Sequence, residues 1–371
     1  MLLKNYIYLI LIFVFFGVLS VYFLFVPNLI AEIFAGEAPV WFTHLIHTIY
    51  PRFEVEKNRF SLDFFLNKAN QVVIRLTLFN SLLFTFLFFY ERNNKFRHQI
   101  NNFFRQKAEK SNLRFLCILF YTGIIFFTAG WYQDYENLQK IAVFYQPISF
   151  LKLFGTKFLP IFTFWFLMGL LHFLCLLLIF NVRPFLCSCL AAVLFVFLQA
   201  FFYSFEKIDH TYTTLTYASL LMPFLVWEIQ FFSEQISKQA LLGIQLTLSW
   251  AYLQAGLEKL LVSGWQWFQP ETLQFHLLTH QAPAGIWLAR YGFLCMTLQF
   301  LVIAFELGFV LVVFFPKIRY VFIISGVLFH LGTYIFLNVG GWLSPWIFAY
   351  IFFVDWQGLD LFLTRKNGEN V

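Results

Sequence analysis

The sequence predicts an all-α, polytopic transmembrane helical bundle. Hydrophobic residues make up 60% of the 371 residues and charged residues only 12%, about half the charged share of a typical soluble domain. Several apolar runs exceed the roughly 18 residues that mark a membrane-spanning helix. Because a soluble core does not need so many uninterrupted apolar stretches, we expect an integral membrane protein whose partner is the lipid bilayer.

Apolar run length predicts about ten spans. The first run is longer than the apolar part of a signal peptide and has no small-residue cleavage site, so we expect it to stay uncleaved. The last run is short, follows Gly340-Gly341 and contains Pro345, which leaves a re-entrant segment as the alternative to a span. The predicted spans are 6–26, 72–90, 113–131, 159–180, 184–204, 211–231, 239–261, 287–315, 318–338 and 341–355.

The spans fall into three predicted parts. Residues 1–110 hold two spans and an external loop, residues 111–358 hold the other spans, and residues 359–371 form a short tail. The external loop, 30–70, alternates short apolar pieces with charges, and we expect an interfacial helix at 39–50.

The loop between Glu91 and Arg114 predicts the orientation of the bundle. It is rich in Lys and Arg, and short loops of this kind stay in the cytoplasm. This places the N- and C-termini in the cytoplasm and a candidate active-site cavity on the opposite side. Binding of anionic lipid is an alternative role for the loop. The net charge of +6 is explained by this loop without a nucleic-acid partner. Its basic residues are Arg92, Lys95, Arg97, Arg105, Lys107, Lys110 and Arg114.

The most informative segment is Tyr252 to Leu260, because it carries Glu258 and Lys259 at membrane depth. A charge inside a bilayer costs roughly 2.5 kcal/mol or more, so an intramembrane lysine indicates a functional site. Burial disfavours the ammonium form and makes the free amine, a base, accessible. The structural alternative is a lysine near the end of its span that snorkels to the headgroups.

Three further ionisable residues fall in or near apolar segments. His330 is surrounded by Val, Leu and Phe residues, and Glu306 is predicted to pair with Lys259 or His330. His210 follows Asp209, a predicted helix cap, at the start of a span. A hydrogen-bonded core histidine and a solvated interfacial histidine are the alternatives for His330 and His210.

The sequence gives little support for other kinds of site. His276 and His280 are four residues apart, and His44 and His47 three apart, but neither pair has a nearby third ligand. No metal is expected, because catalytic zinc needs at least three protein ligands. The five cysteines form no CxxC motif, and nucleotide, hydrolase and c-type haem motifs are absent. A haem between His172 and His330 has weak support.

Three motifs in order carry a family resemblance. They are Ala255-Gly256-Leu257-Glu258-Lys259-Leu260 with Gly264-Trp265-Gln266-Trp267, then Asp209-His210-Thr211-Tyr212, then Phe329-His330 leading to Asp355-Trp356. On these residues, 113–358 resembles the horizontally transferred transmembrane (HTTM) domain, the membrane part of vitamin K-dependent γ-carboxylases.

The resemblance implies roles for individual residues. Lys259 falls on the base that deprotonates reduced vitamin K, and His210 on a histidine that assists carboxylation of a substrate glutamate. His330 falls on a family histidine to which we assign no specific role. Tyr252, Trp265 and Glu306 are the predicted contacts of a menaquinol-type quinol. The implied activity is that of a lyase, acting on a secreted peptide or protein in a bacterial inner membrane.

The chain departs from the family in two ways. It ends fifteen residues after Trp356, without the large extramembrane domain of the carboxylases, and it has the extension 1–110. The alternatives are therefore a quinone-binding redox protein and a non-catalytic component for maturation or export of a secreted peptide. A transporter is less favoured, since no paired broken helices occur in matching halves.

Overall fold

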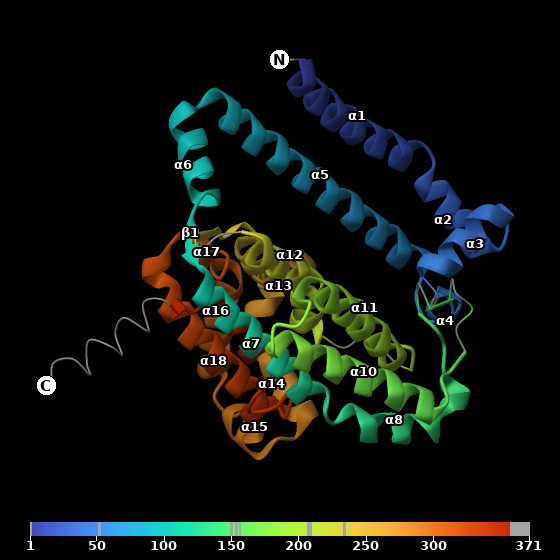
Figure 1. Ribbon diagram of the computed structural model, residues 1–371. Helices are drawn as coiled ribbons and strands as arrows, with labels where there is room; N and C mark the ends of the chain where they lie inside the picture. Colours follow the sequence, from blue (N-terminus) through green and yellow to red (C-terminus); the bar gives the residue numbers. More distant parts are fainter. Residues whose placement is uncertain are drawn as a thin grey trace, which may run out of the picture. The chain divides into compact units, whose positions relative to one another are not determined.

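The structure is a computed structural model that describes residues 2–50, 53–148, 151–152, 155, 157–205, 210–232 and 235–356. Within these ranges the chain is helical except for turns and one pair of short strands. The chain divides into two compact units, Met1–Phe103 and Phe104–Val371. We describe each unit by itself (Figure 1).

Six helical segments of the described chain are long and apolar enough to cross a membrane. Each coincides with a predicted span, so the chain is an integral membrane protein built of α-helices. The segments are Ile10–Ala35, Leu62–Arg92, Lys110–Gln139, Ile161–Ile179, Pro184–Tyr203 and Pro316–Leu337.

The other four predicted spans differ from these six. Helices α12 (Thr213–Phe231) and α13 (Gln239–Ser263) have 19 and 25 residues, which is sufficient length, but they carry more polar side chains. The predicted span 287–315 is broken, and its apolar helix α16 (Gly292–Gly308) has 17 residues. Residues 341–355 form only α19 (Pro345–Phe348) and the 3₁₀ helix η4 (Ala349–Phe353). These two are too short to cross a hydrocarbon core of about 30 Å, so the count of ten spans remains unconfirmed.

The first unit is a helical hairpin with a capped end. The amide Nδ2 of Asn80 in α5 donates to the carbonyl oxygen of Leu11 in α1 at 3.1 Å, which joins the two long helices by a polar contact. The unit consists of α1 (Leu2–Leu24), α2 (Val26–Ala35), α3 (Val40–Ile49), α4 (Phe53–Lys57), α5 (Leu62–Arg92) and most of α6 (Asn94–Phe104).

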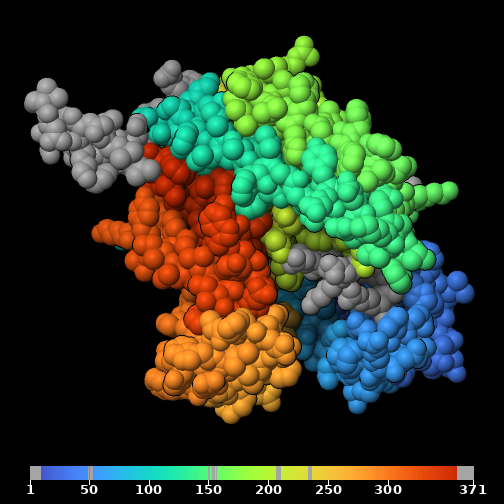
Figure 2. Space-filling model, turned by 90° about the horizontal axis from the view of Figure 1, so that it is seen from below, coloured from blue at the N-terminus to red at the C-terminus, as the bar shows by residue number. Residues whose placement is uncertain are grey.

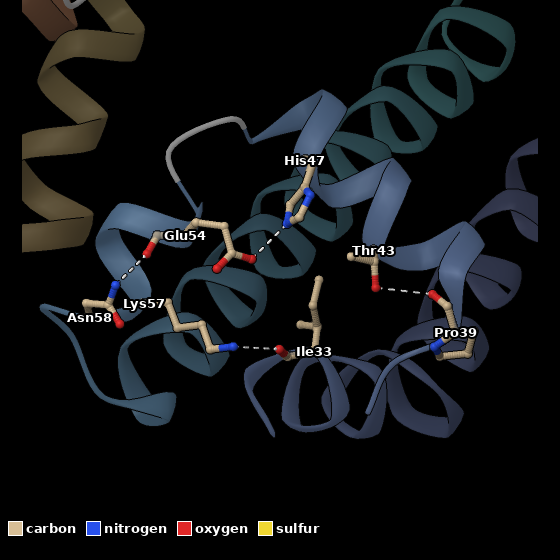
Figure 3. Close-up of polar contacts among 7 residues, drawn as sticks. All are labelled: Ile33, Pro39, Thr43, His47, Glu54, Lys57 and Asn58. Carbon is tan, nitrogen blue, oxygen red and sulfur yellow. Dashed lines mark hydrogen bonds and ion pairs between the residues drawn. The ribbon is translucent and has the colours of Figure 1, made fainter. Parts of the chain in front are cut away.

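The cap of this hairpin has its own apolar cluster, formed by Ile33, Phe42, Phe53 and Phe65. Polar contacts close it at the surface (Figure 3): His47 Nε2 lies 2.9 Å from Glu54 Oε1, and another contact runs from the Lys57 ammonium to the Ile33 carbonyl oxygen at 3.3 Å. The predicted helix at 39–50 is confirmed as α3, while its position at a membrane interface remains a prediction.

In the second unit, α7 packs against α10 and α12, α11 lies between α10 and α12, and α13 lies between α12 and α16. Figure 2 shows the segment α14–α15 (light orange) as a lobe beside the C-terminal elements (red), and α18 contacts both of its helices. Besides α12, α13, α16, α19 and η4, this unit contains α7 (Lys110–Thr128), α8 (Trp131–Gln139), η1 (Ala142–Phe144), α10 (Ile161–Ile179), α11 (Pro184–Tyr203), η2 (Gly264–Phe268), α14 (Pro270–His280), α15 (Pro283–Leu288), α17 (Leu311–Phe314), η3 (Pro316–Ile318) and α18 (Arg319–Leu337).

Helix α10 shows how this composition builds a bundle. Its sequence is apolar all round, so periodicity does not select a buried face. In the structure Phe164 and Met168 are fully buried, whereas Phe162, Phe166 and Phe173 are exposed. The phenylalanines thus serve both as packing and as lipid-facing surface, since Phe is favourable in hydrocarbon.

Two short strands tie the segment before α7 to the α12–α13 connection. Strand β1 (Lys107–Glu109) pairs antiparallel with β2 (Gln235–Ser237), with Ala108 opposite Ile236. Ala108 and Ile236 are both buried. The backbone groups of these segments therefore have partners where the helices end.

Candidate acid–base site

One face of α13 carries a row of polar and small residues, although Gln254 and Glu258 are exposed elsewhere on the helix. Gln245, Ser249, Tyr252, Gly256 and Lys259 follow one another at spacings of four and three residues, the repeat that keeps side chains on one stripe of a helix. All are buried except Lys259, which is partly buried. The side of α13 turned toward the bundle thus carries polar groups among its buried leucine and isoleucine side chains, and these polar groups are kept from lipid.

A close approach of two helices positions the site. A Cβ atom placed on Gly256 would lie 3.1 Å from Glu306 Cβ and 2.9 Å from a Leu307 methyl carbon of α16. Only glycine allows this spacing without displacement, because its side chain is a single hydrogen. Gly256 therefore brings α16 close enough for its carboxylate to reach the lysine one turn further along α13.

Lys259 and Glu306 form an ion pair. The Lys259 ammonium nitrogen lies 2.6 Å from Oε1 and 2.8 Å from Oε2 of Glu306, distances typical of charge-assisted hydrogen bonds. The Glu306 side chain is 4% exposed and that of Lys259 is 23% exposed. Of the two predicted partners of Glu306, the structure selects Lys259. The carboxylate is enclosed, whereas the lysine retains an open side.

An aromatic ring covers another side of the ammonium group. The Lys259 nitrogen lies 5.3 Å from the centre of the Trp267 ring in η2, within the range of a cation–π interaction. The carbonyl oxygen of Trp267 accepts a hydrogen bond from Gln299 Nε2 of α16 at 2.5 Å. Gln299 thereby fixes the 3₁₀ turn that holds the indole beside the lysine.

A second polar cluster lies at Tyr252, two turns before Lys259 on the same face of α13. The Tyr252 hydroxyl oxygen is 2.8 Å from His330 Nε2 and 2.7 Å from the Tyr350 hydroxyl oxygen. The ring of Trp346 stacks on His330 with centres 5.7 Å apart. Seven helical residues span roughly 10.5 Å, so this cluster is adjacent to the lysine site but separate from it.

The structure brings the predicted residues together in part. Lys259 contacts Glu306 directly, and Tyr252 contacts His330 directly. His210 has an exposed side chain and joins the second cluster through its backbone, whose carbonyl oxygen accepts from Trp346 Nε1 at 2.9 Å. Its motif partner Asp209 and the end of the chain, 357–371, lie outside the described residues.

Trp265, a predicted quinol contact, is an exposed residue. Its ring is 78% exposed and contacts Phe268, and the tryptophan beside the lysine is Trp267 instead. Gly264, with φ of +54°, turns the chain where α13 ends and η2 begins. A 3₁₀ helix advances by three residues per turn rather than 3.6, which changes the direction of each side chain.

Other candidate ligands take structural positions. His172 Nε2 is 2.9 Å from the Thr128 hydroxyl oxygen, and the side chains of His276 and His280 are exposed on α14. Over the described ranges, no group of three or more His, Cys, Asp or Glu side chains has an arrangement that could hold a metal ion.

The sequence reasoning did not identify Gln299 or Tyr350, and it named Gly256 and Trp267 only as motif residues, without the contacts described above. A signal for Gln299 is available: Gln299 and Glu306 are seven residues apart on α16, as Tyr252 and Lys259 are on α13. Two packed helices with polar residues at matching intervals indicate a shared polar seam. No comparable pattern identifies Tyr350.

Comparison with protein-family models, curated proteins and solved structures gives no match for this chain.

Proposed function

We propose that this chain is a membrane enzyme that removes a proton from a lipid-soluble quinol, with Lys259 as the base. The contact that supports the proposal is the ion pair between Lys259 and the enclosed carboxylate of Glu306. Transfer of one ammonium proton to that carboxylate leaves a free amine beside a neutral acid. The amine then accepts a proton from the substrate hydroxyl and returns to the ammonium form.

The surroundings of Lys259 fit an apolar substrate. Val262, three residues after Lys259 on α13 and on a neighbouring side of the helix, is an exposed apolar side chain, and the Trp267 ring forms an aromatic wall. A ligand dissolved in the hydrocarbon can approach over such a surface, whereas water is a poor competitor there. Reduced vitamin K, when bound, would supply the acidic hydroxyl and, with oxygen, the oxidising chemistry.

The proposal extends to carboxylation of a glutamate on a secreted peptide, assisted by His210. The support for this second step is the resemblance of the 113–358 segment to the carboxylase membrane domain, together with the exposed His210 side chain. A bacterial inner membrane, with both termini in the cytoplasm, belongs to the same proposal.

One observation favours a second candidate, a non-catalytic component for peptide maturation or export. Lys259 is held by both carboxylate oxygens of Glu306, and such a contact also serves to lock two helices together. In a non-catalytic component, the positive charge of Lys259 would hold α13 to α16, and the basicity of its amine would have no role.

Lys259→Arg separates the two candidates. Arginine keeps the positive charge and can form a two-point contact with Glu306, but its guanidinium does not act as a base. Purified wild type, Lys259→Arg, Lys259→Ala and the exposed control Lys317→Arg would be given reduced vitamin K, oxygen, bicarbonate and a glutamate peptide. If the chain is the proposed enzyme, we expect only wild type and Lys317→Arg to form vitamin K epoxide. Full function of Lys259→Arg in peptide maturation, without epoxide from any variant, would favour the non-catalytic candidate.

A further inference from the structure

The lobe formed by α14 and α15 exposes large apolar side chains, although neither helix can cross a membrane. The two helices have 11 and 6 residues, whereas a crossing takes about 20. Exposed apolar side chains that gather on one small element mark an interaction site. The exposed apolar side chains of the lobe are Phe275, Leu278, Ile286 and Trp287.

The lobe packs against the end of a helix that is long enough to cross the membrane. The candidate span Pro316–Leu337 has 22 residues, about 33 Å of helix, so its two ends lie where a hydrocarbon core of about 30 Å gives way to headgroups. A Cβ atom placed on Gly285 of α15 would collide with the carbonyl oxygen of Phe336 in α18. Phe336 also packs against the buried cluster that contains Leu277 and Leu288 of the lobe. The lobe therefore lies at the level of the lipid–water interface.

Hydrogen bonds fix the lobe to a second helix of the bundle. The Gln299 amide Nε2 of α16 donates to the carbonyl oxygen of Gln269, directly before α14, at 3.3 Å. Within the lobe, the Gln274 amide Nε2 of α14 donates to the carbonyl oxygen of Ala289, directly after α15, at 2.7 Å. Because both of its ends are held, the depth of the lobe in the membrane follows from that of α16 and α18.

Helix α14 turns an apolar side outward. Phe275 and Leu278 are three residues apart and share one side of the helix, whereas the buried Leu277 points almost the opposite way, since each residue turns the helix by about 100°. Glu271, in the first turn, is the polar end of the outward side. His280 is exposed about 140° around the helix from Phe275. An apolar side beside a polar one is typical of a helix that lies in the plane of a membrane interface.

Two exposed tryptophans mark the same level. Trp287 on α15 is 52% exposed, and Trp342, five residues after the end of α18, is 68% exposed. Tryptophan is enriched where the hydrocarbon meets the headgroups. From residue 270 to residue 291 the sequence has one acidic residue, Glu271, and one basic residue, Arg290. This balance gives the lobe no net attraction to anionic lipid, so its affinity for the interface comes from apolar area.

We propose that the α14–α15 lobe is an interfacial hairpin whose partner is the lipid surface of the bilayer that the bundle crosses. Phe275, Leu278 and Trp287 insert beside the acyl chains, and His280 faces the water. This inference does not depend on the chemistry assigned to Lys259. It accounts for the apolar surface of an element that does not cross the membrane.

The test measures the depth of nitroxide labels on the full chain in phosphatidylcholine nanodiscs. Phe275→Cys and Leu278→Cys place labels on the outward side of α14, and His280→Cys is the matched control on the same helix. All three are made with Cys189→Ser, because Cys189 is partly exposed while the other four cysteines are buried. Collisions with oxygen, which concentrates in hydrocarbon, are compared with collisions with a water-soluble nickel chelate.

We expect the labels at Phe275 and Leu278 to lie about 5–10 Å below the headgroups, and the chelate to reach mainly the label at His280. Adding phosphatidylglycerol to the nanodiscs should leave both depths unchanged. If one of the two outward variants fails to fold, the other carries the same test.

Two results would overturn the proposal. Equal access of the chelate to all three labels would leave the apolar side of α14 to a water-soluble partner. Insertion that occurs only with phosphatidylglycerol would show that charge, and not apolar area, brings the lobe to the membrane.

Discussion

Replacing Glu306 by glutamine removes the negative charge that faces Lys259 while it keeps the size of the side chain. The Lys259 nitrogen is 2.6 Å from Glu306 Oε1, so in Glu306→Gln it either stays as an uncompensated cation or gives up its proton. Both results cost free energy relative to the native pair. Breaking a buried ion pair from one side typically costs 3–5 kcal/mol.

The partial exposure of Lys259, 23% of its side chain, places the expected cost at the lower end, at about 3 kcal/mol. For a folding unit of this size, about 2 °C of melting temperature corresponds to 1 kcal/mol. We therefore expect the melting temperature of Glu306→Gln in detergent to fall by about 6 °C. Glu136→Gln, in the exposed part of α8, serves as the matched control and should change it by less than about 1 °C.

A double-mutant cycle tests whether the loss of stability in Glu306→Gln comes from the unpaired charge of Lys259. Lys259→Met removes the opposite charge, and Lys259→Met combined with Glu306→Gln contains neither charge. We expect the double variant to be more stable than the sum of the two single changes by about 2 kcal/mol, because no unpaired charge remains. If the single changes are simply additive, or if Glu306→Gln melts like Glu136→Gln, the reasoning from a buried ion pair is refuted.

Three further outcomes follow from the same structure. Gly256→Ala should destabilise the protein by about 1–3 kcal/mol, because its methyl group meets α16; Gly243→Ala, on the same helix with open space around it, should be neutral or stabilising by up to about 1 kcal/mol. A thermal shift for both variants settles the comparison, and equal shifts would contradict the close approach. Tyr252→Phe removes the hydrogen bonds to His330 and Tyr350 and should cost about 1–3 kcal/mol in denaturant unfolding. Cys189 is partly exposed whereas Cys175 is buried, so a small maleimide should label Cys189 first in the folded protein; preferential labelling of Cys175, read by mass spectrometry, would contradict the packing of α10.

Apolar run length was sufficient to predict the long helices α1, α5, α7, α10, α11 and α18, because a bilayer leaves so few alternatives to a spanning helix. It could not predict the break in 287–315. There the Gln274 side chain in α14 donates to the carbonyl oxygen of Ala289 at 2.7 Å, so a distant side chain stabilises the end of α15. Contacts of this kind depend on tertiary structure and leave no local pattern.

The candidate site, like the fold, could be predicted from the sequence only in part. Lys259 could be found because a charge in an apolar helix is conspicuous in sequence, and Glu306 for the same reason. The choice of Trp267 over Trp265 could not be made, since it depends on the turn at Gly264 and on the 3₁₀ geometry that follows. Gly256 was visible as a motif residue, but its role as the contact point with α16 required the packing of the two helices.

The strand pair β1–β2 has a consequence for assembly. Strand β1 precedes α7, and its partner β2 follows α12, so a ribosome releases the first strand well before the second. The ladder forms only after α7, α10, α11 and α12 have been made, and contacts between distant parts of a chain are costly to form early. Pairing of Ala108 with Ile236 therefore joins the two ends of the chain segment that contains these four helices, directly before α13, which carries Lys259.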